Sequence, residues 1–131
     1  MYLAKRFEDA GIPTLYPGLE SHPGHKVFRK LMNTDFGYGG MLTIDVGSQA
    51  NADSLMEKMQ EDKLGYLAVS LGFYKTLFSA SGASTSSEIP EDEQKTMGLN
   101  PGLVRISIGL DHDVENTYER MLACMKEVGV I

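Results

Sequence analysis

The chain has 131 residues, of which 42% are hydrophobic, and its 18 acidic and 12 basic side chains give a formal net charge of -6. This size and composition predict one globular domain with a modest hydrophobic core. The acidic balance and the lack of a lysine or arginine run argue against nucleic acid as a partner, because phosphate binding needs clustered cations.

No apolar run in the sequence approaches the length of a membrane-spanning helix, and the first eleven residues lack the apolar core of a signal peptide. We therefore expect no membrane partner and a cytoplasmic location. The single cysteine, Cys124, has no partner for an intramolecular disulfide, and the three histidines do not have the spacing of a metal site. The sequence predicts no metal, and Cys124 is expected to be a packed thiol rather than a nucleophile.

The N-terminal part predicts a short helix, an edge strand and a second helix. A thin apolar stripe favours a helix within residues 1–12, and residues 14–16 are held between two prolines as in a short edge strand. From Pro23 onward, apolar residues recur at helical spacing, and either Ser21 or His22 is expected to cap that helix.

The middle of the chain predicts a strand, a helix, a second strand and a loop. Residues 41–46 alternate between apolar and polar, which is typical of a half-buried strand, and Asn51 is expected to cap the helix that follows. The short apolar run 66–69 predicts a strand buried on both faces. Six of the nine residues in the range 79–87 carry a hydroxyl group and none carries a charge, so this range is predicted to be a loop.

The C-terminal part predicts a short acidic helix from Pro90, an alternating strand over 103–108, and a final helix over 113–128 with a clear apolar stripe. The whole pattern indicates an α+β fold: one domain over residues 1–131, with a small antiparallel or mixed sheet of three to four strands and helices packed on one face.

Arg105 is the most informative residue for function, because it lies within the predicted strand between Val104 and Ile106. A guanidinium held away from bulk water needs an anionic partner, and its planar fork matches a carboxylate. One interpretation is therefore a receptor for the α-carboxylate of a substrate. The other is a structural ion pair or a solvated arginine on the sheet, and the spacing alone favours this second interpretation.

Four segments, in order, resemble a known enzyme family. They are Tyr16-Pro17-Gly18-Leu19-Glu20-Ser21-His22-Pro23, Gly37-Tyr38-Gly39-Gly40-Met41, Ala68-Val69-Ser70-Leu71-Gly72 and Pro101-Gly102-Leu103-Val104-Arg105-Ile106-Ser107-Ile108-Gly109. The family they resemble is that of the pyridoxal-phosphate-dependent trans-sulfuration enzymes of cysteine and methionine metabolism, which includes methionine γ-lyase. The resemblance extends from about residue 11 to residue 128.

The resemblance implies that the chain corresponds to the C-terminal small domain of these fold-type I enzymes. Family members are much longer, and their Schiff-base lysine belongs to a large domain that is absent from this sequence. By similarity, Arg105 grips the substrate carboxylate, Ser70 helps to seat it, and Thr85 matches a threonine of a family loop. No catalytic or cofactor-binding residue is expected in this chain, and no bound pyridoxal phosphate is expected on the chain alone.

The leading hypothesis is thus a carboxylate-binding domain of a methionine γ-lyase-like lyase or synthase, inactive by itself because it lacks the Schiff-base lysine motif. Its partners would be an amino-acid substrate, the large domain and further copies of the chain. The alternative is a stand-alone module for small-molecule binding or self-association that has lost catalysis. Both hypotheses predict a homo-oligomer, because the loss of a docking partner leaves an apolar patch.

Overall fold

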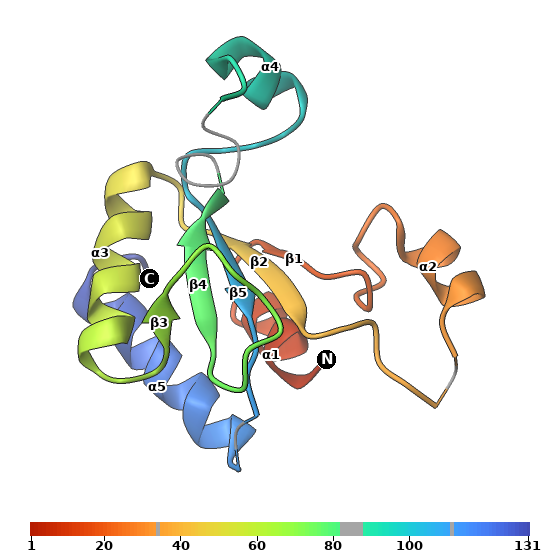
Figure 1. The fold of residues 1–131 in the computed structure, drawn as a ribbon, viewed down its shortest axis with the longest axis horizontal. Coiled ribbons are helices and arrows are strands. Elements are labelled where there is room, and N and C mark those ends of the chain that lie inside the picture. The colour runs from red at the N-terminus through yellow and green to blue at the C-terminus, as the bar shows by residue number, and fades with distance from the viewer. Residues whose placement is uncertain (34, 82–87, 111) are drawn as a thin grey trace.

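The computed structural model describes residues 1–33, 35–81, 88–110 and 112–131. Within these residues the chain forms five α-helices and one five-stranded sheet (Figure 1). The helices are α1 (Tyr2–Asp9), α2 (His25–Leu31), α3 (Gln49–Glu61), α4 (Glu91–Thr96) and α5 (Val114–Glu127). The strands are β1 (Thr14–Leu15), β2 (Met41–Asp45), β3 (Tyr66–Leu67), β4 (Leu77–Ala80) and β5 (Leu103–Ser107).

The strands lie in the order β1-β2-β5-β4-β3, so the last strand in the chain occupies the centre of the sheet. β5 pairs antiparallel with both β2 and β4, β1 pairs antiparallel with β2, and β3 pairs parallel with β4. The predicted α+β class with a mixed sheet is confirmed. The sheet has one strand more than expected because Ser79 and Ala80, which were predicted to be loop, belong to β4.

The hydrophobic core lies on one face of the sheet. The alternation predicted for the two central strands is confirmed, since Leu42, Ile44, Val104 and Ile106 all point into this core. Helices α1, α3 and α5 cover it, as Figure 1 shows, so these three helices pack on one face as predicted. The buried side chains that these helices contribute include Leu3, Phe7, Leu55, Met59, Met121 and Met125.

β3 differs from its prediction. The apolar run was expected to be buried on both faces, but Tyr66 is 52% exposed and Leu67 is 42% exposed. The reason is topological, because β3 is an edge strand that pairs only with β4. Its apolar side chains therefore belong to the surface of this chain.

α2 forms where helical spacing predicted it, but it contributes no buried residue. It stands apart from the sheet in Figure 1, and the side chain of Leu31 is 76% exposed. Its N-cap is Gly24, so the expectation of Ser21 or His22 was wrong. The apolar stripe of α2 thus faces outward in this chain.

α3 and α5 begin at side-chain caps. Ser48 caps α3, since its Oγ accepts a hydrogen bond from the backbone N–H of Asn51 at 3.2 Å, so the predicted cap at Asn51 was wrong. The carboxamide of Asn51 instead donates to the carbonyl oxygen of Val46 at 2.8 Å. Asp113 caps α5 by accepting from the backbone N–H of Asn116 at 2.9 Å. Both caps satisfy helix donors that have no partner within the helix.

Among the helices of the described ranges, none has the length and apolar character that crossing a membrane requires.

Candidate functional site

Arg105 lies in the middle of β5, the central strand. Since neighbouring residues of a strand point to opposite faces, the buried Val104 and Ile106 leave Arg105 on the face away from the helical core. Its cross-strand partners are Thr43 on β2 and Ser79 on β4. Arg105 is half-buried. The neighbouring strands β2 and β4 therefore fix the backbone of Arg105 and the face of the sheet on which its side chain lies.

The structure brings Arg105 and Ser70 together. Nη2 of Arg105 donates a hydrogen bond of 3.1 Å to the backbone carbonyl oxygen of Ser70, which lies in the segment between β3 and β4. The same segment is attached to β5 a second time, because the backbone N–H of Gly72 donates to Oγ of Ser107 at 3.2 Å. Ser70 is exposed, and its contact with Arg105 is made by the main chain.

The charge of Arg105 has no carboxylate partner within the described residues, where the ion pairs involve only Lys5 and Lys58. The structural ion pair that the strand pattern allowed is therefore not found in this part of the chain. A guanidinium has five N–H donors in a rigid fork, and the carbonyl of Ser70 uses one of them. The remaining donors suit a planar anion such as a carboxylate.

Thr85 and the hydroxyl-rich residues beside it fall in the range 82–87, outside the residues that the structure describes. Its predicted place near Arg105 stays a prediction. The structure adds a polar residue that the sequence analysis did not single out: Ser79, directly opposite Arg105 on β4. Ser79 belongs to the buried strand Leu77–Ala80. In the sequence, the hydroxyl-rich residues that follow this strand made its end look like part of a loop.

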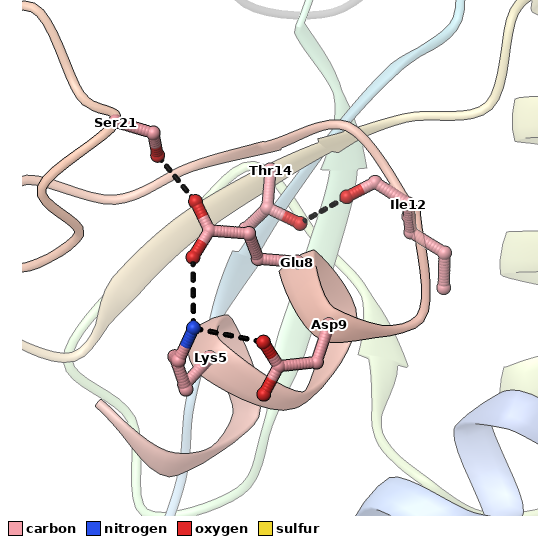
Figure 2. A network of polar contacts seen from close by, with 6 residues as sticks. All are labelled: Lys5, Glu8, Asp9, Ile12, Thr14 and Ser21. Carbon is pink, nitrogen blue, oxygen red and sulfur yellow. Dashed lines mark hydrogen bonds and ion pairs between the residues drawn. The ribbon is translucent and has the colours of Figure 1, made fainter.

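A second polar cluster lies in the N-terminal region. It borders a cavity of about 560 Å³ between α1, β1 and the loop before β5. Figure 2 shows its centre, where the carboxylate of Glu8 contacts Lys5 and the hydroxyl of Ser21. Asp45, which also lines the cavity, accepts from the N–H of Gly47 and the carboxamide of Asn100, both at 2.9 Å. Because these carboxylates already have hydrogen-bond or ion-pair partners within the chain, a structural role accounts for the cluster.

Cys124 is fully buried in α5, which confirms the prediction of a packed thiol. Burial raises the pKa of this thiol to about 11, and the neighbouring carboxylate of Asp62 acts in the same direction. The thiolate that a nucleophile or a metal ligand requires is therefore disfavoured at neutral pH. In the described residues, histidine, cysteine and acidic side chains form no group of three or more that would hold a metal ion.

Comparison with known proteins identifies the family of this chain. The family model described as Cys/Met metabolism PLP-dependent enzyme matches residues 2–125. The chain belongs to this family. It is 49% identical over 116 residues to methionine gamma-lyase of Arabidopsis thaliana, covering 88% of this chain and 26% of that protein. It is 35% identical to cystathionine gamma-lyase of Bacillus subtilis, covering 79% of this chain and 26% of that enzyme.

Solved structures of the family share the fold. The structure of cystathionine gamma-lyase from yeast aligns with a TM-score of 0.86 and 26% identity, covering 98% of this chain and 32% of that chain. A putative O-acetylhomoserine (thiol)-lyase of Campylobacter jejuni aligns with a TM-score of 0.84 at 24% identity, over 95% of this chain and 29% of that chain. The chain thus spans about a quarter of the length of the curated relatives and about a third of the solved ones.

The family depends on pyridoxal phosphate, so we tested whether the lysines of this chain suit covalent attachment of that cofactor. Of the eight lysines, Lys58 is held by Asp62 and Glu127 at 3.1 and 2.8 Å, and the other seven are exposed. The hydrogen bonds to Glu127 and Asp62 raise the pKa of Lys58. A lysine that serves as a nucleophile toward carbonyl groups is desolvated, whereas seven of these amines are exposed and that of Lys58 is held in ion pairs. These lysines do not fit the attachment site, and we assign this chain no step through the cofactor.

Proposed function

We propose that this chain is the substrate-carboxylate-binding part of a pyridoxal-phosphate-dependent C–S lyase or synthase that acts on sulfur amino acids. Arg105 binds the α-carboxylate, and Ser70 and Thr85 contribute to the same site. The cofactor and its lysine belong to a large domain of the family that acts together with this one. Without that domain the chain is catalytically silent.

The observation that carries the proposal is the guanidinium of Arg105, which is fixed on the central strand with no carboxylate partner in the described ranges. A half-buried cation of this kind is stabilised when an anion occupies its free donors. The hydrogen bond to the carbonyl of Ser70 turns one edge of the guanidinium toward the β3–β4 segment, which leaves other donors for a ligand. The backbone that positions Ser70 is also tied to Ser107, so the receptor is built before a ligand arrives.

The substrate class rests on the relatives. The 49% identical plant protein is a methionine gamma-lyase, and the bacterial and yeast relatives are cystathionine gamma-lyases. Their substrates share an α-amino acid carboxylate and a sulfur-containing side chain. A carboxylate receptor such as Arg105 serves any member of this class, so selection of the side chain falls to residues elsewhere in the site.

The surface beside Arg105 supports a partner that covers it. Val69, Leu71, Phe73 and Tyr74 of the β3–β4 segment are all exposed, although three of them are wholly apolar. Clustered exposed apolar side chains mark interaction surfaces. We propose that the large domain and a second copy of the chain cover this segment. The same observation is what favours the second candidate function, a self-association module without catalysis.

Binding of L-methionine to the purified chain tests the carboxylate receptor. The side-chain Nε–Hε signal of Arg105, followed by ¹H–¹⁵N NMR, is expected to shift and saturate on titration. L-methioninamide, which lacks the carboxylate, serves as the matched ligand control and is expected to leave the signal in place. Arg105→Lys keeps the charge but loses the planar fork and should weaken binding roughly tenfold or more. An equal response to both ligands would refute the receptor.

Pyridoxal phosphate itself tests whether the chain is silent. Addition of the cofactor to the chain should give no saturable visible absorbance beyond that of an unfolded control with the same lysines. A stable absorbance that is lost on substitution of one particular lysine would contradict the proposal that the attachment site lies in another domain.

A further inference from the structure

The hydroxyl group of Ser79 is the feature that the proposed function leaves unexplained. Ser79 is only 2% exposed, and its Oγ is buried without a hydrogen-bond partner among the residues that the structure describes. Buried hydroxyl groups in native proteins nearly always have a partner, because losing water without replacing its hydrogen bonds is unfavourable. A serine at such a position is therefore expected to have a hydrogen-bond partner in an arrangement of the site other than this one.

Packing gives no reason for a polar side chain at this position. Ser79 shares its sheet face with Leu77, two residues earlier on β4, and with Leu103 on β5, and both leucines are buried. This part of the face accepts apolar side chains without difficulty. An alanine at position 79 would occupy nearly the same space with no desolvation cost.

The register of the sheet places Ser79 next to a group with several N–H donors, the guanidinium of Arg105. Ser79 on β4 is directly opposite Arg105 on β5. Residues directly opposite in an antiparallel pair share a face, with Cβ atoms about 4.5–5.5 Å apart. Among the described residues, the guanidinium of Arg105 makes one hydrogen bond, to the carbonyl of Ser70. The hydroxyl oxygen of Ser79 is an acceptor within reach of the long side chain of Arg105.

We propose that Ser79 is a positioning residue for Arg105. When a carboxylate binds, the guanidinium turns so that the hydroxyl oxygen of Ser79 accepts one of its N–H groups, while the carbonyl of Ser70 accepts another. The two acceptors hold the fork from both sides and direct its remaining donors at the ligand. This inference rests on the proposed function, since it concerns how the same guanidinium is held.

If Ser79 has this role, Ser79→Ala should affect stability and ligand affinity differently. The free chain should be as stable as the wild type or more stable, because the variant removes a buried hydroxyl that has no partner among the described residues. Its affinity for L-methionine should nevertheless fall roughly 3- to 10-fold, the value of one hydrogen bond. Loss of affinity without loss of stability is a result that a merely structural role of Ser79 does not produce.

The experiment measures both quantities on the same variants. Urea unfolding gives stability, and the Nε–Hε signal of Arg105 in ¹H–¹⁵N NMR gives the dissociation constant of L-methionine and the environment of the bound guanidinium. Ser79→Thr retains the hydroxyl and should restore the bound-state signal. Ser48→Ala, which removes the cap of α3, is the matched control: it should lower stability and leave the dissociation constant unchanged.

Each outcome decides between the two proposals. If L-methionine binds wild type and Ser79→Ala with equal affinity, the positioning role is overturned and the carboxylate receptor stands. If Ser79→Ala loses stability as Ser48→Ala does, the role of Ser79 is structural and the positioning role is again overturned. If L-methionine leaves the signal of Arg105 unchanged in the wild type, the carboxylate receptor fails and the positioning role fails with it.

Discussion

The carboxylate of Asp62 lies 3.4 Å from the thiol of Cys124, measured between Oδ2 and Sγ. Asp62 follows the last turn of α3, and Cys124 lies in α5, so the contact joins the two helices that cover much of the core. Lys58 bridges the same two helices by pairing with Asp62 and with Glu127. Arg120 of α5 also donates to the backbone carbonyl of Asp62. Asp62 is thus the residue on which the α3–α5 contact converges.

Cys124 is expected to resist thiol reagents in the folded chain. Its burial and the carboxylate of Asp62 raise its pKa to about 11, whereas an unperturbed thiol has a pKa of about 8.5. At mildly alkaline pH the folded chain should react with a disulfide reagent roughly 100-fold more slowly than the chain unfolded in guanidinium chloride. The release of the coloured thiol measures both rates. Cys124→Ser is the blank, and equal rates in the two states would contradict the assigned environment.

Asp62 is expected to make stability depend on acid pH. The hydrogen bond from Lys58 holds the pKa of Asp62 below its usual value of 3.8. Stability from this carboxylate is therefore fully present above the unfolded pKa and is lost as the pH falls through the lowered folded pKa. Asp62→Asn should be less stable than the wild type at about pH 7, and the difference should shrink toward about pH 3. Urea unfolding at several pH values measures the difference.

The control for that pH series is Asp9→Asn, which removes an exposed carboxylate paired with Lys5 on α1. Exposed ion pairs contribute little because water and salt screen them. Asp9→Asn should therefore follow the wild type over the whole series. A difference between Asp62→Asn and wild type that stays constant with pH would show that the carboxylate of Asp62 does not carry the effect.

The cap of α3 predicts a measurable loss of stability. Ser48→Ala removes the hydroxyl that accepts from the backbone N–H of Asn51, and such a loss costs about 1 kcal/mol. Ser54→Ala is the matched control, because Ser54 is exposed within the same helix. The midpoint of urea unfolding should fall for Ser48→Ala and stay close to wild type for Ser54→Ala. The reverse order would place the start of α3 elsewhere.

A fourth prediction separates core residues from the apolar residues of α2. Ile106 of β5 is fully buried, and Ile106→Val should lower the free energy of unfolding by about 0.5–1.5 kcal/mol. Leu31 of α2 is 76% exposed. Leu31→Ala removes more atoms than Ile106→Val does, yet it should change the free energy of unfolding by less than about 0.5 kcal/mol. Both values come from denaturant unfolding of the isolated chain. A larger loss for Leu31→Ala would mean that α2 packs on the core.

The sequence was sufficient for the elements whose pattern is set by their own neighbours. The alternation in β2 and β5 correctly predicted which side chains are buried, since both strands have one face on the helical core. The stripe of α5 likewise predicted a packed helix. The pattern failed where burial depends on the order of strands, because nothing in residues 66–69 indicates that β3 lies at an edge.

The candidate site shows the same division. A charge between two apolar strand residues was enough to single out Arg105, and resemblance to the family supplied Ser70. Ser79 was assigned to a hydroxyl-rich loop, and its relation to Arg105 emerges only from the pairing of β4 with β5. Cross-strand register depends on which distant segments pair with each other. The local pattern around Ser79 does not show that β4 pairs with β5, so it could not place Ser79 opposite Arg105.

The central place of β5 has a consequence for how the sheet is completed during synthesis. Before residues 103–107 emerge, β1 can pair only with β2 and β3 only with β4, which leaves two separate ribbons of two strands each. Such ribbons are marginal in water, because each lacks the neighbour that would bury one of its faces and complete its ladder. A premature stop codon ahead of Leu103 would thus leave the nascent polypeptide with two disconnected halves rather than a shortened sheet.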